Sequence, residues 1–464
     1  MSISSKVEKC LLEQGINYQV VNGDHLMPMH ELKSASAVSG EVVAISTLLS
    51  DSLGRLQVLI AKNTFLDLSE LCEQLGRNLQ ALSPAEQERL ANEQGAETLP
   101  AIPSLYNLPI VVDAQLMECE KIYLDSGHDG FFVELNSDEF KKALGQADIG
   151  SFCVPIAKLK DSFQRDDRAE LESAVQQFTT LRIKQRLDQT LEMPPLPDTA
   201  ERIIQLRLDP EAGVGELAEI VEKDPSLAAQ VVSWASSPYY AAPGTIRSVH
   251  DAVVRVLGFD LVINLALGLA LGKSLEVPRD GVYGMNPYWQ ESVYAAAMSE
   301  GLVKAMAADY RPSLGLAYLS GLLHNYGYLV LAHVFPPHYQ LVNRYIEANP
   351  HVNHSYLERH LIGVCREQIG SLLMDSWAMP EEVVSATRWH HLADYEGEFK
   401  EYANVLYVAV NLLRGAGMYQ GDAEVIPAQL YASLGLDPVD AEAVLAKVVE
   451  SRDDLIGMAR NLGG

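Results

Sequence analysis

Histidines are the residues of this chain whose type and spacing most clearly suggest chemistry. Eight of the twelve lie between His324 and His391. Imidazole is the commonest side-chain metal ligand, so this enrichment raises the hypothesis of a metal site. Five of these histidines suit exposed positions at helix ends or in loops: His333, His338, His351, His354 and His360. Two of the five, at 351 and 354, could share one helix face, although no carboxylate or thiolate follows at a spacing that would complete a ligand set.

His324 and Asn325 differ from these five because they interrupt an otherwise apolar run. A helix that is apolar on nearly every side is buried, so we expect a helix over Leu314–Val334 with this polar pair inside. A buried polar pair needs hydrogen-bond partners. A second pair, His390 and His391, ends another expected helix and completes the set of candidates.

The first part of the chain has the elements of an α/β domain. Short runs rich in β-branched residues alternate there with helical patterns and turn signals. They predict a domain with a mixed sheet over residues 1–155. Its expected strands are Val42–Leu49, Leu56–Ala61, Ile110–Val112, Ile122–Leu124 and Gly130–Leu135, and its expected helices are Leu66–Leu75 and Pro84–Gln94.

The rest of the chain has helical patterns almost throughout. The charged stretch Lys158–Leu191 predicts a connecting helix within residues 156–192, which the prolines at 194, 195 and 197 end. Capping signals then predict an all-α domain over residues 193–415, with helices that open at Asp198 with Glu201, Asp224 with Pro225, and Ser248 with Asp251. Further expected helices are Tyr288–Ala308, Leu314–Val334, Pro337–Ala348, Ser355–Asp375, Glu381–Trp389 and Tyr402–Arg414. Residues 416–464 add a helical extension with two more helices.

Composition limits the classes of function. The formal charge of −27 argues against DNA, tRNA or an anionic membrane as a partner, because binding to phosphates needs a basic surface. Five scattered cysteines without a C-x-x-C pair indicate reduced thiols and exclude a zinc ribbon. The N-terminus lacks the apolar core of a signal peptide, and the longest apolar run, Leu261–Leu271, is too short to span a bilayer. We therefore expect a cytoplasmic protein.

Ordered motifs of the helical part resemble the HDOD domain, a signalling branch of the HD metal-dependent phosphohydrolase superfamily. The motifs are Met193–Pro197, Val221–Ala228, Ser248–Gly258, Gly321–Gly327, Gly370–Trp377 and His390-His391. In active members of the superfamily, histidine and aspartate ligands hold one or two metal ions that activate a water for attack on a phosphodiester. The resemblance implies an all-α HD-like fold.

The resemblance also implies which positions of this chain correspond to the superfamily's metal ligands. In chain order, from the first histidine to the late aspartate, these positions are Ser292, His324, Asn325, Arg366 and Asn411. Asparagine offers a neutral oxygen where an anionic one is wanted, and a guanidinium is permanently cationic and repels a metal ion. Only His324, His390 and His391 survive. We therefore expect a vestigial site without a cofactor, in which a single adventitious metal or a small anion near Arg366 is the alternative.

The N-terminal part resembles the YbaK/prolyl-tRNA editing domain, whose active members hydrolyse mischarged aminoacyl-tRNA. The resemblance rests on Val42–Leu49, the turn Asp51–Gly54, Leu66–Gly76, Gly95–Pro103 and Leu108–Asp113. It implies a lysine at the position of Ser46, or of Ile45 if the match is shifted by one residue, for which Lys62 could substitute in space. The vestigial editing site would then comprise Ser46, Lys62, Gly95 and Asp113.

The sequence therefore predicts a non-catalytic signal-transduction protein. Its degenerate HD site would serve as a scaffold for protein interaction or ligand sensing, with a signalling protein as partner. Two enzyme functions stay open as alternatives. One is a metal-dependent phosphohydrolase, and the other is an aminoacyl-tRNA deacylase located in the N-terminal domain.

Overall fold

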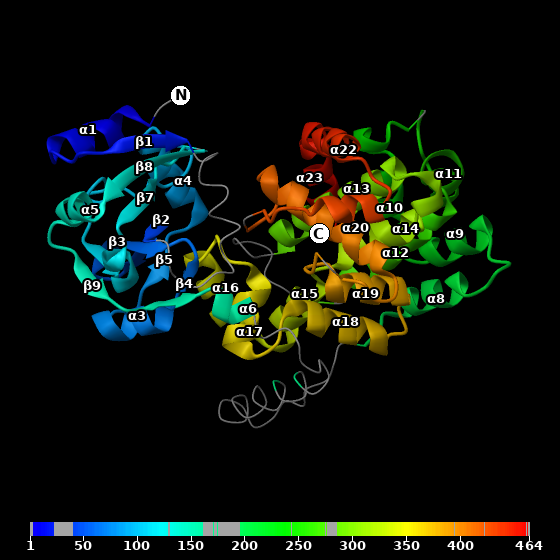
Figure 1. The fold of residues 1–464 in the computed structure, drawn as a ribbon. Helices are drawn as coiled ribbons and strands as arrows, with labels where there is room; N and C mark the ends of the chain where they lie inside the picture. Colours follow the sequence, from blue (N-terminus) through cyan, green and yellow to red (C-terminus); the bar gives the residue numbers. More distant parts are fainter. Residues whose placement is uncertain are drawn as a thin grey trace, which may run out of the picture. The chain divides into compact units, whose positions relative to one another are not determined.

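The structure, a computed structural model, describes residues 3–22, 40–128, 130–160, 170, 174, 195–242, 244–273, 275, 285–393, 395–421, 423–460 and 462. Two compact units make up the chain (Figure 1). Residues 1–165 and 341–361 form the first unit, and residues 166–340 and 362–464 form the second. The predicted connecting helix over Lys158–Leu191 lies almost entirely outside the described residues.

The first unit is built on a mixed sheet of eight strands. Strand β2 pairs antiparallel with β3 and parallel with β7. The predicted α/β domain with a mixed sheet is thereby confirmed, and each of the five expected strands is present. Along the sheet the order is β1 (Gln19–Asn22), β8 (Phe131–Asn136), β7 (Lys121–Asp125), β2 (Glu41–Asp51), β3 (Gly54–Ala61), β6 (Ile110–Asp113) and β9 (Asp148–Gly150), and β5 (Gln80–Ala81) also pairs with β2.

Short helices complete the first unit. Helices α1 (Ser5–Glu13) and α5 (Ser137–Leu144) bury their apolar sides in one core with the sheet, because their hydrophobic residues recur at helical spacing. A two-stranded sheet joins β4 (Thr64–Leu66) to β10 (Cys153–Pro155). The other elements are α3 (Leu68–Leu75), α4 (Pro84–Glu93), the 3₁₀ helix η3 (Ala114–Glu118) and α6 (Ala157–Lys160).

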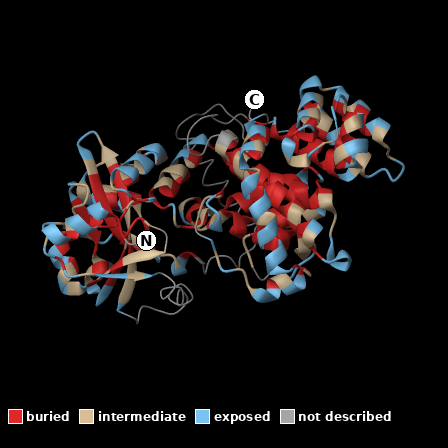
Figure 2. Ribbon diagram, turned by 90° about the horizontal axis from the view of Figure 1, so that it is seen from above, coloured by how far each residue is buried: buried red, intermediate tan, exposed pale blue. Residues whose placement is uncertain are grey.

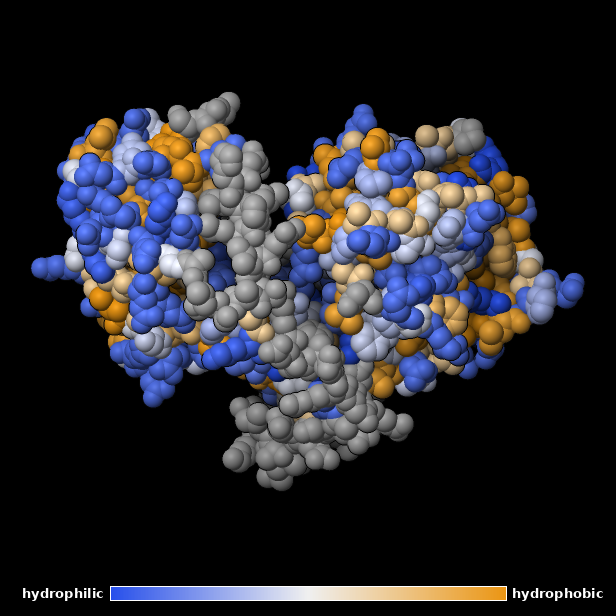
Figure 3. All heavy atoms as spheres, in the orientation of Figure 1, coloured by the Kyte–Doolittle hydropathy of each residue, from blue (hydrophilic) through white to orange (hydrophobic). Residues whose placement is uncertain are grey.

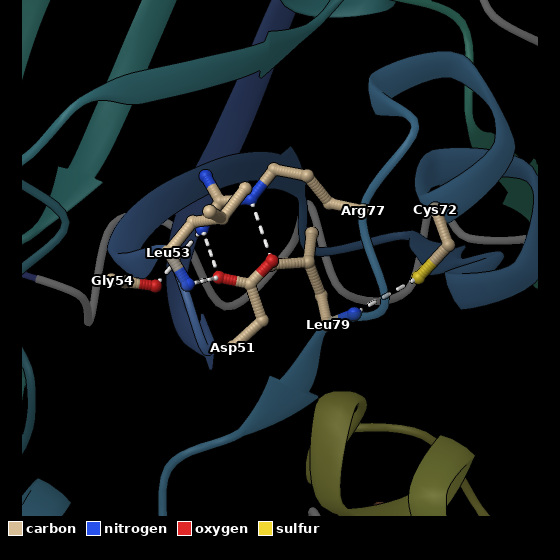
Figure 4. Close-up of polar contacts among 6 residues, drawn as sticks. All are labelled: Asp51, Leu53, Gly54, Cys72, Arg77 and Leu79. Carbon is tan, nitrogen blue, oxygen red and sulfur yellow. Dashed lines mark hydrogen bonds and ion pairs between the residues drawn. The ribbon is translucent and has the colours of Figure 1, made fainter.

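The turn between β2 and β3 is held by an ion pair between Asp51 and Arg77 (Figure 4). Arg77 donates from Nε to Asp51 Oδ2 at 2.9 Å and from Nη2 to Oδ1 at 2.6 Å. The N–H of Leu53 donates to the same carboxylate at 2.8 Å, and Arg77 also reaches the carbonyl of Gly54. This network lowers the pKa of Asp51 to about 2, chiefly through the hydrogen bond from Arg77.

We predict that replacing Arg77 with alanine removes an acid-dependent part of the stability of the first unit. The pKa of Asp51 is lower in the folded state than its unfolded value of about 3.9. The ion pair therefore stabilises fully above about pH 4 and loses its effect as the pH falls towards 2. Thermal unfolding followed by circular dichroism across this range should lose part of its pH dependence in Arg77→Ala. The exposed ion pair of Arg89 with Glu93 gives the control, and Arg89→Ala should keep the wild-type profile.

The second unit is helical, as predicted. Figure 2 shows its buried residues gathered where the helices meet. Helix α12 is buried from Leu261 to Gly272, and α14 and α15 are buried along nearly their whole length. Its elements among the described residues are α8 (Asp198–Arg207), α9 (Val214–Glu222), α10 (Pro225–Ala235), α11 (Val249–Ala252), α12 (Phe259–Gly272), α13 (Met285–Ala305), α14 (Leu314–Leu323), α15 (Tyr326–Val334), α18 (Arg366–Ser376), α19 (Glu381–Trp389), α20 (Lys400–Gly415), α21 (Ala428–Ser433), α22 (Pro438–Glu450) and α23 (Arg452–Arg460), with short 3₁₀ and π turns between them.

Several expected helices differ from the structure. The single helix predicted over Leu314–Val334 is two helices, because Asn325 leaves the helical region with φ −96° and ψ 12°. The helix predicted over Ser355–Asp375 is divided at Gly363, whose φ of +79° suits only glycine well. Asp198 lies in the first turn of α8 and does not cap it, since Pro197 holds the N-cap position. The C-terminal tail has three helices, α21 to α23, where two were expected.

Helices α16 (Pro336–Ala348) and α17 (His354–Ile362) cross the boundary between the two units in sequence. Most of their residues belong to the first unit. His351 lies in the turn before α17 and so does not share a helix face with His354, contrary to expectation. Of the five histidines expected to be exposed, only His360 is exposed, and the other four are partly buried.

The surface mixes hydrophilic and hydrophobic side chains on the face drawn in Figure 3. Among the described residues, large apolar side chains that reach solvent are scattered, with Leu53, Leu208 and Val439 among the most exposed. Isolated apolar residues of this kind are ordinary on a folded protein. Over the described ranges, no helix has the length and apolar character needed to cross a bilayer.

Candidate functional site

Six helices of the second unit carry or flank the predicted metal-site positions. Pairs of these helices pack against each other, among them α13 with α14, α14 with α19, α15 with α18, and α18 with α19. The positions are distributed as Ser292 in α13, His324 and Asn325 between α14 and α15, Arg366 at the first residue of α18, His390 and His391 after α19, and Asn411 in α20. The helix packing therefore gathers residues that are more than 100 positions apart in sequence.

His324 is completely buried, and both of its ring nitrogens have partners. Nδ1 lies 2.8 Å from the carbonyl oxygen of Gly321, which can only accept, so Nδ1 carries the proton. The ring of His390 stands edge-on to the ring of His324, with the two centroids 5.1 Å apart. Burial, followed by the charge of His390, lowers the pKa of His324 well below its usual value. The imidazole is therefore neutral, and its Nε2 is an acceptor.

Tyr419 fills the remaining acceptor position of His324. Its hydroxyl donates to His324 Nε2 at 2.7 Å. The side-chain amide of Asn325 donates to the same hydroxyl oxygen. The phenol thus joins both members of the pair that corresponds to the superfamily's His-Asp motif. Burial raises the pKa of Tyr419, so the hydroxyl keeps its proton and its role as a donor.

The segment around Tyr419 is fastened to two further places in this region. The backbone N–H of Gln420 donates to Glu291 Oε1 at 3.1 Å, one residue before Ser292 in α13. The backbone N–H of Glu424 donates to Asn411 Oδ1 at 2.9 Å. We call residues 416–427 the strap, of which 422 lies outside the described residues. Hydrogen bonds therefore join the strap to three predicted ligand positions, His324, Asn325 and Asn411, and to Glu291, the neighbour of a fourth.

Arg366 and Glu291 are ionisable groups of this region that act on each other. The guanidinium carbon of Arg366 lies 4.3 Å from the centre of the Tyr328 ring, and the side chain is 6% exposed. Burial raises the pKa of Glu291 to about 7, against the opposing effects of the Gln420 hydrogen bond and the positive charges of Arg366 and Arg414. The cation at position 366 therefore has a ring beneath it and an acidic group in its surroundings.

In the first unit, the lysine position of the predicted editing site is occupied by a hydrogen-bonded serine. Ser46 Oγ accepts from the side-chain amide of Gln57 at 3.1 Å. The same amide nitrogen donates to the carbonyl oxygen of Ile102 at 3.3 Å. Gln57 is 1% exposed, so this amide links strand β2 to the segment 95–103 inside the domain. The segment itself packs closely on Gly127, where a Cβ atom would lie 2.6 Å from the carbonyl oxygen of Thr98.

The other three predicted editing residues have separate places in this unit. Lys62 follows β3, and its backbone N–H donates to the carbonyl of Val43 at the start of β2. Gly95 ends helix α4 with φ +68°. Asp113 is 1% exposed and accepts from the N–H of Gln115 at 3.0 Å and of Phe152 at 3.1 Å. Asp113 therefore satisfies two backbone N–H groups in the interior of the domain.

Comparison with known proteins supplies the family. The HDOD domain model matches residues 193–393, and the aminoacyl-tRNA editing domain model matches residues 24–143. A crystal structure of a protein from Marinobacter aquaeolei VT8, described as a candidate signal transduction protein, is 41% identical, covers 99% of both chains and superposes with a TM-score of 0.85. The chain therefore contains an HDOD domain. It carries an editing domain ahead of its HDOD domain.

Two further relatives are more distant. An HDOD domain protein of unknown function from Geobacter sulfurreducens is 20% identical, covering 64% of this chain and 99% of its own, with a TM-score of 0.51. A Treponema pallidum protein described as uncharacterized is 23% identical over 217 residues. That match spans 47% of this chain and 41% of the Treponema protein.

The residues of the HDOD site do not fit the metal centre of the wider HD superfamily. A metal ion there would need the Nε2 lone pair of His324, which the hydroxyl of Tyr419 occupies. Arg366 adds a permanent positive charge to the region. Across the part of the chain that the structure describes, no three histidine, cysteine or acidic side chains are grouped closely enough to hold a metal ion.

Sequence reasoning missed Tyr419, Gln57, Glu291 and Arg414. Tyr419 and Arg414 lie at or beyond the predicted end of the HDOD domain, about 100 residues after His324 in the sequence. Gln57 stands among the apolar residues of β3. A polar side chain at such a position must find a hydrogen-bond partner inside the domain, and this was the only local signal for its role. Glu291 had a weaker signal, because it is next to Ser292.

Proposed function

We propose that this HDOD protein is a non-catalytic signal-transduction protein whose former hydrolase site is a closed part of its core. The observation that carries the proposal is the hydrogen bond from Tyr419 to His324 Nε2. A tyrosine that occupies the coordinating lone pair stabilises the site without a metal, and Arg366 opposes the return of one. The site then contributes a fixed conformation, which a binding partner can recognise, in place of an activated water.

The relative of known structure supports the signalling part of the proposal. The Marinobacter aquaeolei protein is described as a candidate signal transduction protein and shares nearly the whole length of this chain. We propose the cytoplasm as the place of action and a signalling protein, such as a kinase or a nucleotide cyclase, as the partner. Affinity capture with the full-length chain as bait, with Tyr419→Phe as a second bait, tests this. Equal recovery of a signalling enzyme by an unrelated acidic bait would count against it.

The editing domain fits the same proposal as a binding platform. Its lysine position holds Ser46, and the amide of Gln57 uses the serine hydroxyl as an acceptor. Deacylation of alanyl- or prolyl-tRNA by the full-length protein is expected to equal the uncatalysed rate. Deacylation that Lys62→Ala abolishes would instead establish the editing function.

The proposed loss of hydrolysis predicts a clear result in metal analysis. Full-length protein exchanged into Mn²⁺ and then dialysed should retain well under one metal ion per chain, because Tyr419 and Arg366 both oppose binding. Hydrolysis of bis(p-nitrophenyl) phosphate should match the buffer blank. Tyr419→Phe frees the Nε2 lone pair and should take up at most one weakly held ion, still without hydrolysis. Tyr310→Phe, which alters a tyrosine that is 53% exposed, is the matched control.

One outcome would restore the phosphohydrolase alternative. Tight binding of two Mn²⁺ ions by the wild-type chain, with hydrolysis that His324→Ala removes, would contradict the proposal.

A small anion near Arg366 was the other predicted occupant of the site. Titration of the same protein preparation with inorganic phosphate measures whether such an anion binds. The acidic group of Glu291, on whose pKa Arg366 acts, disfavours such an anion.

A further inference from the structure

The chain leaves the former metal site at Asn325 and returns to it at Arg366. Between these residues it forms α15, α16 and α17. The HDOD family match includes this whole stretch. Residues 341–361 nevertheless belong to the compact unit of the editing domain. We call residues 341–361 the coupling segment.

The coupling segment closes the open edge of strand β4. Asn349 is fully buried, and its amide accepts from the N–H of Leu66 at 2.6 Å and donates to the Leu66 carbonyl at 3.0 Å. His351 Nε2 donates to the carbonyl of Thr64 at 2.8 Å. Positions 64 and 66 present their backbone groups to the same side of the strand, so two side chains act as a third strand beside β4.

Other residues of the coupling segment hold β2 and the start of α3. The hydroxyl of Tyr345 donates to Asp67 Oδ1 at 2.8 Å, and it accepts from the backbone N–H of Ser69 at 3.1 Å. Asp67 is the N-cap of α3, so Tyr345 supports the beginning of that helix. Thr47 Oγ1 in β2 donates to the carbonyl of Ala348 at 3.2 Å. The coupling segment is therefore a built-in part of the editing domain.

The start of α16 follows α15, and the end of α17 leads into α18. Both α15 and α18 belong to the HDOD domain. Helices α15 and α18 touch through their backbones at Gly327 and Gly370. A Cβ added to Gly327 would lie 1.9 Å from the carbonyl oxygen of Arg366 and 2.6 Å from the N–H nitrogen of Gly370. Tyr328 in α15 supports the guanidinium of Arg366 at the start of α18. The two helices that begin at the former metal site are thus fixed to each other.

We propose that the coupling segment links the conformation of the former metal site to the stability of β4 and α3 in the editing domain. Tyr328 of α15 packs on Tyr339 of α16, with the ring centroids 5.0 Å apart, and α16 continues across the unit boundary between 340 and 341. A shift of α15 would then reach Tyr345 and Asn349 through this helix. Packed helices transmit such shifts because protein interiors compress little. Coupling of this kind is reciprocal. It holds whether or not either site is catalytic, so it can fail independently of the proposed function.

Hydrogen exchange of the full-length protein tests the coupling in both directions. Tyr419→Phe removes the bond to His324 and should raise exchange about fivefold or more in peptides that cover residues 63–70. Asn349→Ala removes the cap on β4 and should raise exchange by a similar factor in peptides that cover residues 416–421. Peptides from 121–136, in the same unit as β4, should keep their wild-type exchange in Tyr419→Phe, which separates coupling from general unfolding.

The controls change the same residue types at exposed positions. Tyr310→Phe and Asn92→Ala should leave both sets of peptides unchanged. Should Asn349→Ala unfold the editing domain, Thr47→Val replaces it, since that isosteric change removes one hydrogen bond to the coupling segment. Exchange that rises only in the unit carrying each substitution would overturn the proposal.

Discussion

Replacing Gly327 with alanine is expected to lower the free energy of unfolding of the HDOD domain by about 3 kcal/mol or more. The new Cβ would lie 1.9 Å from the carbonyl oxygen of Arg366. Both of its nearest neighbours are backbone atoms of α18, so no side-chain rotation can relieve the overlap. Helices α15 and α18 would have to separate, and the stacking of Arg366 on Tyr328 would be lost with them.

Denaturation followed by tryptophan fluorescence measures this change directly. All four tryptophans of the chain, at 234, 289, 377 and 389, lie in the second unit, so the signal reports on the HDOD domain. The matched control is Gly457→Ala in α23, where an added Cβ meets nothing within 4 Å. That change should be neutral or stabilise by about 0.5–1 kcal/mol, because alanine favours the helix. A Gly327→Ala variant as stable as the wild type would show that the two backbones are not in contact.

Asp113→Ala is expected to destabilise the editing domain by about 2–3 kcal/mol. The carboxylate is buried and accepts from two backbone N–H groups, of Gln115 and Phe152. Alanine would leave both donors without a partner in the interior. Asp113→Asn keeps one acceptor oxygen, so it should lower the free energy of unfolding by about half as much.

Thermal unfolding of Asp113→Ala is followed by circular dichroism, which reports on both units, and by tryptophan fluorescence, which reports on the second unit. The comparison shows which unit is destabilised. The transition of the first unit should move to lower temperature, with the tryptophan transition changed less. Asp148→Ala, at an exposed position of the edge strand β9, is the control and should stay within about 0.5 kcal/mol of the wild type. Wild-type stability together with lost deacylation would show that Asp113 is a functional residue of an editing site.

The candidate residues of the HDOD site were predictable in part. His324 and Asn325 were recognisable as a buried polar pair, because polar residues inside an apolar helix must be satisfied. Their partner was not recognisable. Tyr419 is a tyrosine in a glycine-containing segment, and only the packing of α20 against α13 and α14 brings that segment to His324. Local patterns carry no information on contacts of this kind.

Helix boundaries were likewise predictable only in part. The apolar stretch around His324 predicted burial correctly, because burial follows from composition. It did not predict the break at Asn325, where the bonds to Tyr419 replace helical continuity. The break at Gly363 had a visible signal in the glycine itself, yet the long helical pattern around it outweighed that signal.

By itself, the sequence determined the two fold classes, the order of the domains and the buried polar pair. Each of these follows from residue type and periodicity, which act over a few neighbouring positions. Tertiary structure alone decided that Tyr419 occupies the lone pair of His324. It also decided that residues 341–361 complete the editing domain. Contacts between residues about 100 to 300 positions apart depend on how whole helices and strands pack, and that packing is a property of the entire chain.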